Sequence, residues 1–159
     1  MKRVTNLNAP FVTLIFVLLF TLPACKKDAA NSDNLVGKWQ ATIPMSAQKS
    51  TYEFKSDRTY EHTLHVIDTV TKKDLGIIAR ETGKYKISNA KLGLYDMLSY
   101  LNKDNKPGTI DDLKAIEGLK TYDYDVAITN RNRLTLNHQC GANELCTANY
   151  VPPFYYVRQ

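Results

Sequence analysis

The sequence contains no apolar run long enough to cross a membrane as a helix. Its main apolar run, Phe11–Leu22, has 12 residues, whereas a spanning helix needs about 20. The positively charged pair Lys2–Arg3 precedes this run, and the small residue Ala24 follows it. A basic start, a short apolar stretch and a small residue are typical of a secretory signal peptide. We therefore expect residues 1–24 to be a signal peptide.

Cysteine is scarce, with three in the whole chain, and the first of them directly follows the signal region. The tetrapeptide Leu22-Pro23-Ala24-Cys25 resembles the lipobox of bacterial lipoprotein signals, with Leu22, Ala24 and Cys25 at the matching offsets. The resemblance implies that Cys25 carries a lipid, becomes the first residue of the mature protein and anchors the chain to a lipid bilayer. An ordinary secretory signal, cleaved without lipidation, is the alternative.

The other two cysteines, Cys140 and Cys146, lie close together in the sequence. If Cys25 is lipidated they are left as a pair, and disulfides persist in oxidising compartments such as the cell envelope. A bridge would close a loop of about seven residues, which is worth roughly 2–2.5 kcal/mol of chain entropy. A zinc site is the alternative, but zinc needs further donors and only His138 lies nearby. We expect a disulfide and no metal site.

Strong charge of one sign is also absent. The formal net charge is +5, and a signal peptide would remove two of these positive charges with Lys2 and Arg3. Lysines and arginines form no stripe interleaved with aromatic residues. This balance argues against a nucleic-acid-binding protein.

Motifs of common enzyme classes do not occur in the sequence. It has no Gly-x-Ser-x-Gly nucleophile turn, no His-Glu-x-x-His zinc motif and no glycine-rich phosphate loop. Asp123 and Asp125 lie two apart and would share the polar face of one strand, where carboxylates are usually solvated. We expect no enzymatic activity and no cofactor.

The composition changes after Cys25. Residues 25–34 are polar and lack large apolar side chains, so we expect a flexible tether. Residues 35–159 form short runs in which apolar and polar residues alternate, which is typical of strands with one buried face. Strands are predicted over 51–55, 59–66, 75–87, 91–95, 122–129, 134–138 and 154–158. The pattern predicts one all-β domain of seven or eight antiparallel strands, either a closed barrel or a sandwich.

Residues 96–119 interrupt the alternation. The spacing over 96–101 is helical, and Thr109 with Asp112 matches an acidic capping box. Apolar residues then recur at three-residue intervals, which favours a short amphipathic helix: Ile110, Leu113, Ile116 and Leu119. We expect a short helical insertion between strands.

Several short motifs resemble the small lipocalin-like lipoproteins of Bacteroidetes-type bacteria. They are Leu35–Trp39 with its Gly-x-Trp opening, the hairpin Tyr52–Tyr60, the segment Thr82–Lys86 and the terminal Tyr155–Arg158. The hairpin carries Asp57-Arg58 where the family usually has Asp-Gly. The resemblance implies an eight-stranded up-and-down barrel, a central cavity open at one end, and Arg158 packed on Trp39 at the closed end.

A small apolar or amphipathic ligand inside the barrel is the leading functional hypothesis. Tyrosines suit such a cavity because they offer apolar surface and a hydroxyl that fixes orientation. The inward register offers as lining residues Tyr52, Phe54, Tyr60, His62, Leu64, Tyr85, Tyr124, Val126 and Leu136. A barrel interior filled by its own side chains is the alternative.

His62 and His138 both fall on the apolar faces of their strands. Two inward histidines could ligate a haem iron or a copper ion. Histidines hydrogen-bonded inside a barrel are the simpler explanation, and we assign neither a cofactor nor a metal.

A non-catalytic envelope module that binds or inhibits another protein is the second functional hypothesis. The loop between Cys140 and Cys146 and the segment 96–119 would supply its contact surfaces. Under either hypothesis we expect a lipid-anchored protein of the bacterial outer membrane, on the periplasmic face or the cell surface. The charged residues Lys26-Lys27-Asp28 favour surface export weakly.

Overall fold

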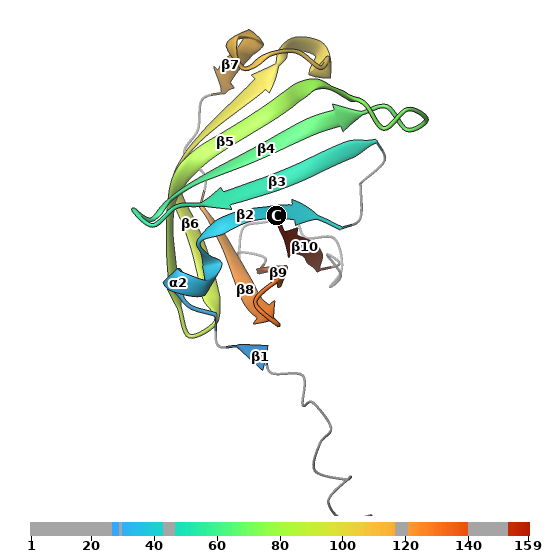
Figure 1. Cartoon of the computed structure of the whole chain (residues 1–159). Coiled ribbons are helices and arrows are strands. Elements are labelled where there is room, and N and C mark those ends of the chain that lie inside the picture. Colours follow the sequence, from blue (N-terminus) through green and yellow to red (C-terminus); the bar gives the residue numbers. More distant parts are fainter. Residues whose placement is uncertain (1–26, 29, 43–46, 117–120, 140–152) are drawn as a thin grey trace, which may run out of the picture.

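The computed structural model describes residues 27–28, 30–42, 47–116, 121–139 and 153–159. Nearly all of its regular structure is antiparallel β (Figure 1). The elements in chain order are β1 (Lys27–Asp28), α2 (Ser32–Leu35), β2 (Gly37–Ala41), β3 (Gln48–Phe54), β4 (Thr59–Ile67), β5 (Asp74–Ser88), β6 (Lys91–Asn102), η1 (Lys103–Asn105), η2 (Ile110–Asp112), β7 (Leu113–Ile116), β8 (Tyr122–Thr129), β9 (Arg133–Gln139) and β10 (Phe154–Arg158).

Eight of the strands close into a barrel in the order β2-β3-β4-β5-β6-β8-β9-β10, and β10 pairs back onto β2. Strands β2 to β5 lie side by side, and β5 curves round to meet β6 (Figure 1). The first half of β6 pairs with β8 and its second half with β7. The short strand β1 pairs with the end of β8. The predicted all-β, eight-stranded antiparallel barrel is confirmed.

Apolar and polar residues alternate along the strands, and the apolar set fills the barrel. On β8 the buried residues are Tyr124, Val126 and Ile128, while the residues between them are half-buried or exposed. Leu134 and Leu136 of β9 lie opposite Ile128 and Val126 and are also buried. Apolar burial of this kind, at about 25 cal/mol per Å², is the main force that holds the barrel together.

The helical turn α2 lies against the closed end of the barrel. Asn31 and Asn34 cap it reciprocally, each side chain accepting from the other's backbone N–H at 2.8–2.9 Å, and Leu35 is completely buried. Both β1 and α2 involve residues of 25–34, which the composition predicts as a tether. The ordered domain therefore begins before Leu35.

Trp39 and Arg158 meet at the same end. The indole Nε1 of Trp39 donates to the Leu35 carbonyl at 2.7 Å, and the Arg158 guanidinium lies over the indole ring. Arg158 also donates to the carbonyls of Val36 and Asn34. The predicted Trp39–Arg158 contact is confirmed.

The predicted helical insertion is wrong over the described residues 96–116, and residues 117–119 lie outside the described residues. Strand β6 continues to Asn102 because β5 offers it a partner up to Leu101. Asp96 has a φ of 52°, which resets the alternation so that both Leu94 and Met97 are buried. With the alternation reset, the apolar residues of 96–101 have a spacing that resembles that of a helix, namely Met97, Leu98 and Leu101.

The predicted capping box forms, but it caps a single 3₁₀ turn. Thr109 and Asp112 bond reciprocally, and the backbone N–H of Thr109 donates to Asp112 Oδ2 at 2.7 Å. The chain then continues directly as strand β7. The capping contact was therefore predictable from the sequence, whereas the fact that it precedes only one helical turn was not.

The β3–β4 hairpin tip and the region of Gly83 are two places where the sequence predicts an unusual backbone. At the β3–β4 hairpin tip Arg58 has a φ of 66°, and its N–H donates to the Lys55 carbonyl at 3.1 Å. Arg58 therefore takes the left-handed position that glycine usually fills after a type I turn. Opposite Gly83 the β5–β6 register shifts between Thr82 and Lys84. An irregularity is therefore present where the sequence predicts one, but the extra residue belongs to β6.

The predicted lipidation of Cys25 and the predicted Cys140–Cys146 disulfide lie outside the described residues. In the described part of the chain, no helix is both long and apolar enough to cross a membrane.

Candidate functional site

The inner wall of the barrel changes from packed to solvent-accessible along its length. On β6, Leu92 and Leu94 are 0% exposed, whereas Leu101, at the other end of the same strand, is 40% exposed. On β4, Tyr60 is 2% exposed, while His62 and Leu64 are half-buried. The closed end is therefore filled by side chains, and solvent reaches the wall toward the other end.

A set of polar side chains, which we call the polar belt, lies where these two halves meet. Its members are Ser50, Tyr52, Tyr60, His62, Glu81 and Tyr124. Cross-strand pairing places Tyr52 opposite His62 and His62 opposite Glu81, so that β3, β4 and β5 present the belt on one face. The belt is thus built by strand register.

Hydrogen bonds link the belt across the strands. The Tyr60 hydroxyl donates to Glu81 Oε1 at 3.1 Å, and Ser50 Oγ lies 2.8 Å from His62 Nε2. The Tyr52 and His62 rings stack with centroids 4.1 Å apart. Among the described residues, every buried side-chain nitrogen or oxygen has a hydrogen-bond partner, so the belt is a satisfied network rather than a strained one.

Burial sets the protonation of the belt. Burial raises the pKa of Tyr52, Tyr60 and Tyr124 above the ordinary value of 10.0, and the negative charge of Glu81 adds to the rise for each of them. Burial lowers the pKa of His62 from 6.5 to about 4. At neutral pH the tyrosine hydroxyls and the His62 imidazole of the belt are therefore neutral.

Apolar residues, which we call the apolar lip, continue the same face beyond the belt. Its members are Leu64, Ala79, Leu101 and Ile116. Leu64 pairs with Ala79 and Ala79 with Leu101, while Ile116 pairs with Ser99, which itself lies opposite Glu81. Leu101 and Ile116 are 40% and 44% exposed. An accessible apolar surface thus lies next to a polar belt.

The nine predicted lining residues all lie on the inner face of the barrel. Phe54, Tyr85, Val126 and Leu136 are buried in the packed half. Tyr52, Tyr60, His62 and Tyr124 lie in the belt at the boundary, and Leu64 lies in the accessible half. That any of them contacts a ligand stays a prediction.

Sequence reasoning missed Glu81, although a signal for it was present. Glu81 is four residues before Tyr85 and two before Gly83, so the period of two places it on the inner face. It also missed Leu101 and Ile116, because the segment that contains them was interpreted as helical.

The two inward histidines occupy different surroundings. His62 contacts Ser50 and Tyr52, whereas His138 packs against the rings of Tyr122 and Tyr124, with centroids 5.8 and 5.5 Å away. Within the described ranges no three His, Cys, Asp or Glu side chains gather closely enough to hold a metal ion. The belt offers one carboxylate and one imidazole, fewer donors than a protein metal site usually supplies.

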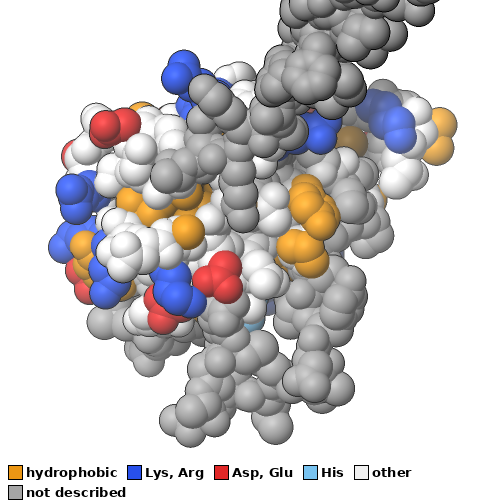
Figure 2. Space-filling view, turned by 90° about the horizontal axis from the view of Figure 1, so that it is seen from below, with side chains coloured by type: hydrophobic (Ala, Val, Ile, Leu, Met, Phe, Trp, Pro, Cys, Tyr) orange, Lys and Arg blue, Asp and Glu red, His pale blue; other side chains and the backbone are white. Residues whose placement is uncertain are grey.

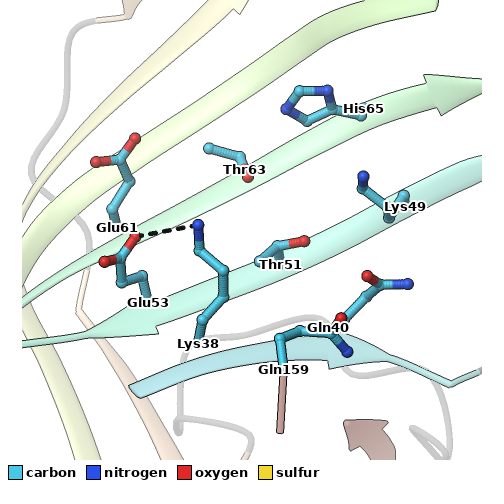
Figure 3. A pocket seen from close by; sticks show the side chains of 9 residues that line it. All are labelled: Lys38, Gln40, Lys49, Thr51, Glu53, Glu61, Thr63, His65 and Gln159. Carbon is cyan, nitrogen blue, oxygen red and sulfur yellow. Dashed lines mark ion pairs between the residues drawn. The ribbon is translucent and has the colours of Figure 1, made fainter. Parts of the chain in front are cut away.

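A groove of about 460 Å³ lies on the outer face of the barrel, across β2, β3 and β4 (Figure 3). Its walls carry polar side chains of both charge signs: Lys38, Gln40, Lys49, Thr51, Glu53, Glu61, Thr63, His65 and Gln159. The charges pair with neighbours, Lys38 with Glu53 at 3.6 Å and Glu61 with Arg80 at 2.9 Å. The groove therefore offers hydrogen bonds and little net charge.

The paired acids of this groove do not match acid–base catalysis. Glu53 and Glu61 are directly opposite each other on β3 and β4. A hydrolytic carboxylate pair needs one member whose pKa is raised so that it can donate a proton. The hydrogen bond from Arg80 instead lowers the pKa of Glu61.

Charged side chains are mixed over the surface. On the coloured part of the face seen in Figure 2, lysines and arginines alternate with acidic residues around small apolar areas. Asp125 on the outside of β8, for example, pairs with Lys91 at 2.9 Å. A mixed surface offers no one-sign patch to a polyanion on the face shown.

Comparisons with known proteins add little to this geometry. No protein family model and no curated protein matches the chain. A search of solved structures finds an NMR structure of a protein from Bacteroides thetaiotaomicron VPI-5482. It is 18% identical, covers 84% of this chain and 97% of its own, and has a TM-score of 0.45. A similarity of this size says nothing about what the chain binds.

Proposed function

We propose that the protein is a lipid-anchored, lipocalin-like lipoprotein of the bacterial outer membrane that binds a small amphipathic ligand in the accessible half of its barrel. The observation that carries this proposal is the order of surfaces along one inner face, from the packed core through the polar belt to the apolar lip. Leu101 and Ile116 remain 40% and 44% exposed there. A polar group of the ligand would lie at the belt and its apolar part along the lip.

The chemistry of the wall supports binding rather than reaction. Tyr60, His62 and Tyr124 are neutral at neutral pH because burial disfavours their charged forms. Neutral hydroxyls and an imidazole fix the orientation of a ligand at low desolvation cost.

Uptake of a neutral fluorescent lipophile by protein purified without detergent tests the proposal. We expect N-phenyl-1-naphthylamine to gain fluorescence and to saturate at one site per chain. Ala79→Trp would place a large ring on the inner face between Leu64 and Leu101, and we expect it to weaken uptake at least tenfold.

Ala127→Trp is the matched control. Ala127 is also a half-buried strand alanine, but it lies on β8 between the inward residues Val126 and Ile128, and so faces outward. Its variant should bind the probe like the parent protein. A parent protein that takes up no probe, or equal losses in both variants, would refute binding inside the barrel.

The anchor is tested separately. Labelled palmitate should enter the protein in a lipoprotein-processing bacterium, and Cys25→Ser should abolish labelling and release a folded protein from the membrane fraction. Cys146→Ser is the control and should stay labelled. A Cys25→Ser variant that remains in the membrane contradicts the proposed tether.

A protein-binding module is the alternative, and one observation favours it. Leu75 and Ile110 are 46% and 52% exposed and line one surface hollow on the outside of the barrel, beside the loop that contains Gly108. Capture of one defined envelope protein, lost in the Leu75→Ser, Ile110→Ser double variant but kept in Ala79→Trp, would support this function instead.

A further inference from the structure

Strand β1 fixes the point at which the chain enters the barrel. Lys27 pairs with Thr129 and Asp28 with Ile128, the last two residues of β8. Figure 1 shows β1 beside that end of β8, whereas β7 lies at the opposite end of the barrel. The chain therefore enters next to the β8–β9 turn, at the closed end and away from the apolar lip.

A second set of contacts holds the following residues at the same end. Ala30 packs against the hydrophobic core, and Asn31 and Asn34 cap the turn α2 directly after it. Leu35, the last residue of α2, is completely buried. Opening of the short β1–β8 pair would therefore leave Ala30 and α2 in place.

Very few residues separate Cys25, the proposed lipidation site, from these contacts. An extended chain spans at most about 3.6 Å per residue, so the Cα of Cys25 lies within about 7 Å of that of Lys27 and about 18 Å of that of Ala30. Strand β6 has 12 residues and is roughly 36 Å long, or about 25–30 Å along the axis of a barrel with tilted strands. The anchor is therefore too short to reach past the barrel to its open end.

The β8–β9 turn beside this anchor carries positive charge. The segment Thr129–Leu134 contains Arg131 and Arg133, both exposed, and no acidic residue. Its backbone is held in place, because Arg158 Nε donates to the Arg131 carbonyl at 2.9 Å and the Arg158 N–H donates to the Asn132 carbonyl at 2.9 Å. Exposed arginines next to a lipid anchor are attracted to the phosphate groups of bilayer lipids.

We propose that the short tether holds the closed end of the barrel, at the β8–β9 turn, against the phosphate-bearing head groups of the bilayer, and that the open end faces away. The inference rests on the proposed lipid anchor at Cys25 and adds the surface by which the protein meets the membrane. The apolar lip then faces the aqueous compartment. A ligand therefore enters the barrel from the aqueous side and not directly from the bilayer.

Quenching by nitroxide-labelled lipid head groups measures the two ends separately. The lipidated protein is reconstituted into vesicles of phosphatidylethanolamine and phosphatidylglycerol that contain a lipid with a nitroxide on its head group. A fluorescent coumarin amino acid replaces either Asn132, exposed in the β8–β9 turn, or Val70, exposed in the hairpin between β4 and β5 at the open end. Because a nitroxide quenches only at short range, we expect at least threefold stronger quenching at Asn132 than at Val70.

A longer tether tests the cause of this orientation. A flexible Gly-Ser linker of about twenty residues between Lys26 and Lys27 keeps the lipid and the barrel but lets the barrel turn. We expect quenching at Asn132 to fall to the value at Val70. The same linker after Gln159, which leaves the tether unchanged, should keep the difference between the two positions.

The outcomes separate this orientation from the proposed anchor. If palmitate labels the protein at Cys25 but the two positions are quenched equally, or Val70 more strongly, the orientation is wrong and the anchor stands. If palmitate does not label Cys25, both proposals fall. Stronger quenching at Asn132 that persisted with the linker before Lys27 would overturn the role of the short tether.

Discussion

The guanidinium carbon of Arg158 lies 4.3 Å from the centroid of the Trp39 ring. Arg158 and Trp39 are also paired across β10 and β2. Arg158 therefore links the last strand of the barrel to its first strand. Its nitrogens reach the carbonyls of Asn34 and Val36 as well. One side chain thus holds α2 against the closed end of the barrel.

Replacement of this arginine should loosen that end. We expect Arg158→Ala to lower the free energy of unfolding by about 2–3 kcal/mol, because a cation–π contact with a buried ring and charge-assisted hydrogen bonds are lost together. Arg158→Lys should recover only part of the lost stability, because a lysine ammonium lacks the planar set of donors with which the guanidinium reaches several carbonyls at once. Urea unfolding measures the change. Arg133→Ala removes an exposed arginine from neighbouring β9, and an equal loss there would rule out a specific role for Arg158.

Gly83 is required by a close approach of two neighbours. A Cβ there would lie 2.8 Å from the Tyr95 carbonyl oxygen and 2.9 Å from Tyr60 Cε1. We expect Gly83→Ala to cost about 1–3 kcal/mol of stability through overpacking at the bulge. Gly93→Ala is the control, because its Cβ would first meet Cε of the exposed, long Lys86 side chain at 3.0 Å. Comparable melting temperatures for the two variants would contradict the steric argument.

Arg58 carries a left-handed backbone that suits glycine better. A φ of 66° costs a non-glycine residue roughly 1–2 kcal/mol of folding free energy. Glycine avoids this cost, but part of the gain is lost because glycine has greater conformational freedom in the unfolded chain. We expect Arg58→Gly to raise the free energy of unfolding by about 0.5–1 kcal/mol. Lys86→Gly, at an exposed position within β5, should instead lower it by roughly 1 kcal/mol. A destabilised Arg58→Gly protein would show that the Arg58 side chain, not its backbone, holds the turn.

His62 should make stability depend on pH. Burial holds its folded pKa at about 4, below the ordinary 6.5, so the unfolded chain binds the proton more tightly between these values. The stabilisation is fully present above pH 6.5 and is lost as the pH falls through 4, by about 3 kcal/mol in all. Carboxylates with lowered pKa, such as Glu61, contribute their own loss at more acid pH.

Urea midpoints at several pH values between 4 and 7 measure this effect. His62→Gln should flatten the dependence between pH 6.5 and 4.5, because glutamine does not titrate. His65→Gln, on the outer face beside Asp74, should keep the steep dependence of the parent. Parallel curves for the parent and His62→Gln would mean that His62 does not stay neutral in the folded protein.

Alternation was sufficient to predict antiparallel strands with one buried face, because strand residues with a period of two place one set on the same side. It left a barrel and a sandwich open, and the resemblance of short motifs was what implied the barrel. The β3–β4 hairpin, the turn over 130–132 and the inward sides of β8 and β9 all follow from alternation. The same rule fails at a bulge. The left-handed Asp96 inserts one residue between Leu94 and Met97, and the apolar spacing then resembles that of a helix.

The sequence by itself determined the strands, their inward faces and the Trp39–Arg158 pair, since these depend on local period and short motifs. Only the tertiary structure decided where the barrel is packed and where solvent reaches its wall. That outcome depends on β6 leaving β8 and pairing with β7, contacts between residues far apart in the chain. It also decided the surroundings of His62, because burial and cross-strand neighbours, not residue type, keep its imidazole neutral at neutral pH.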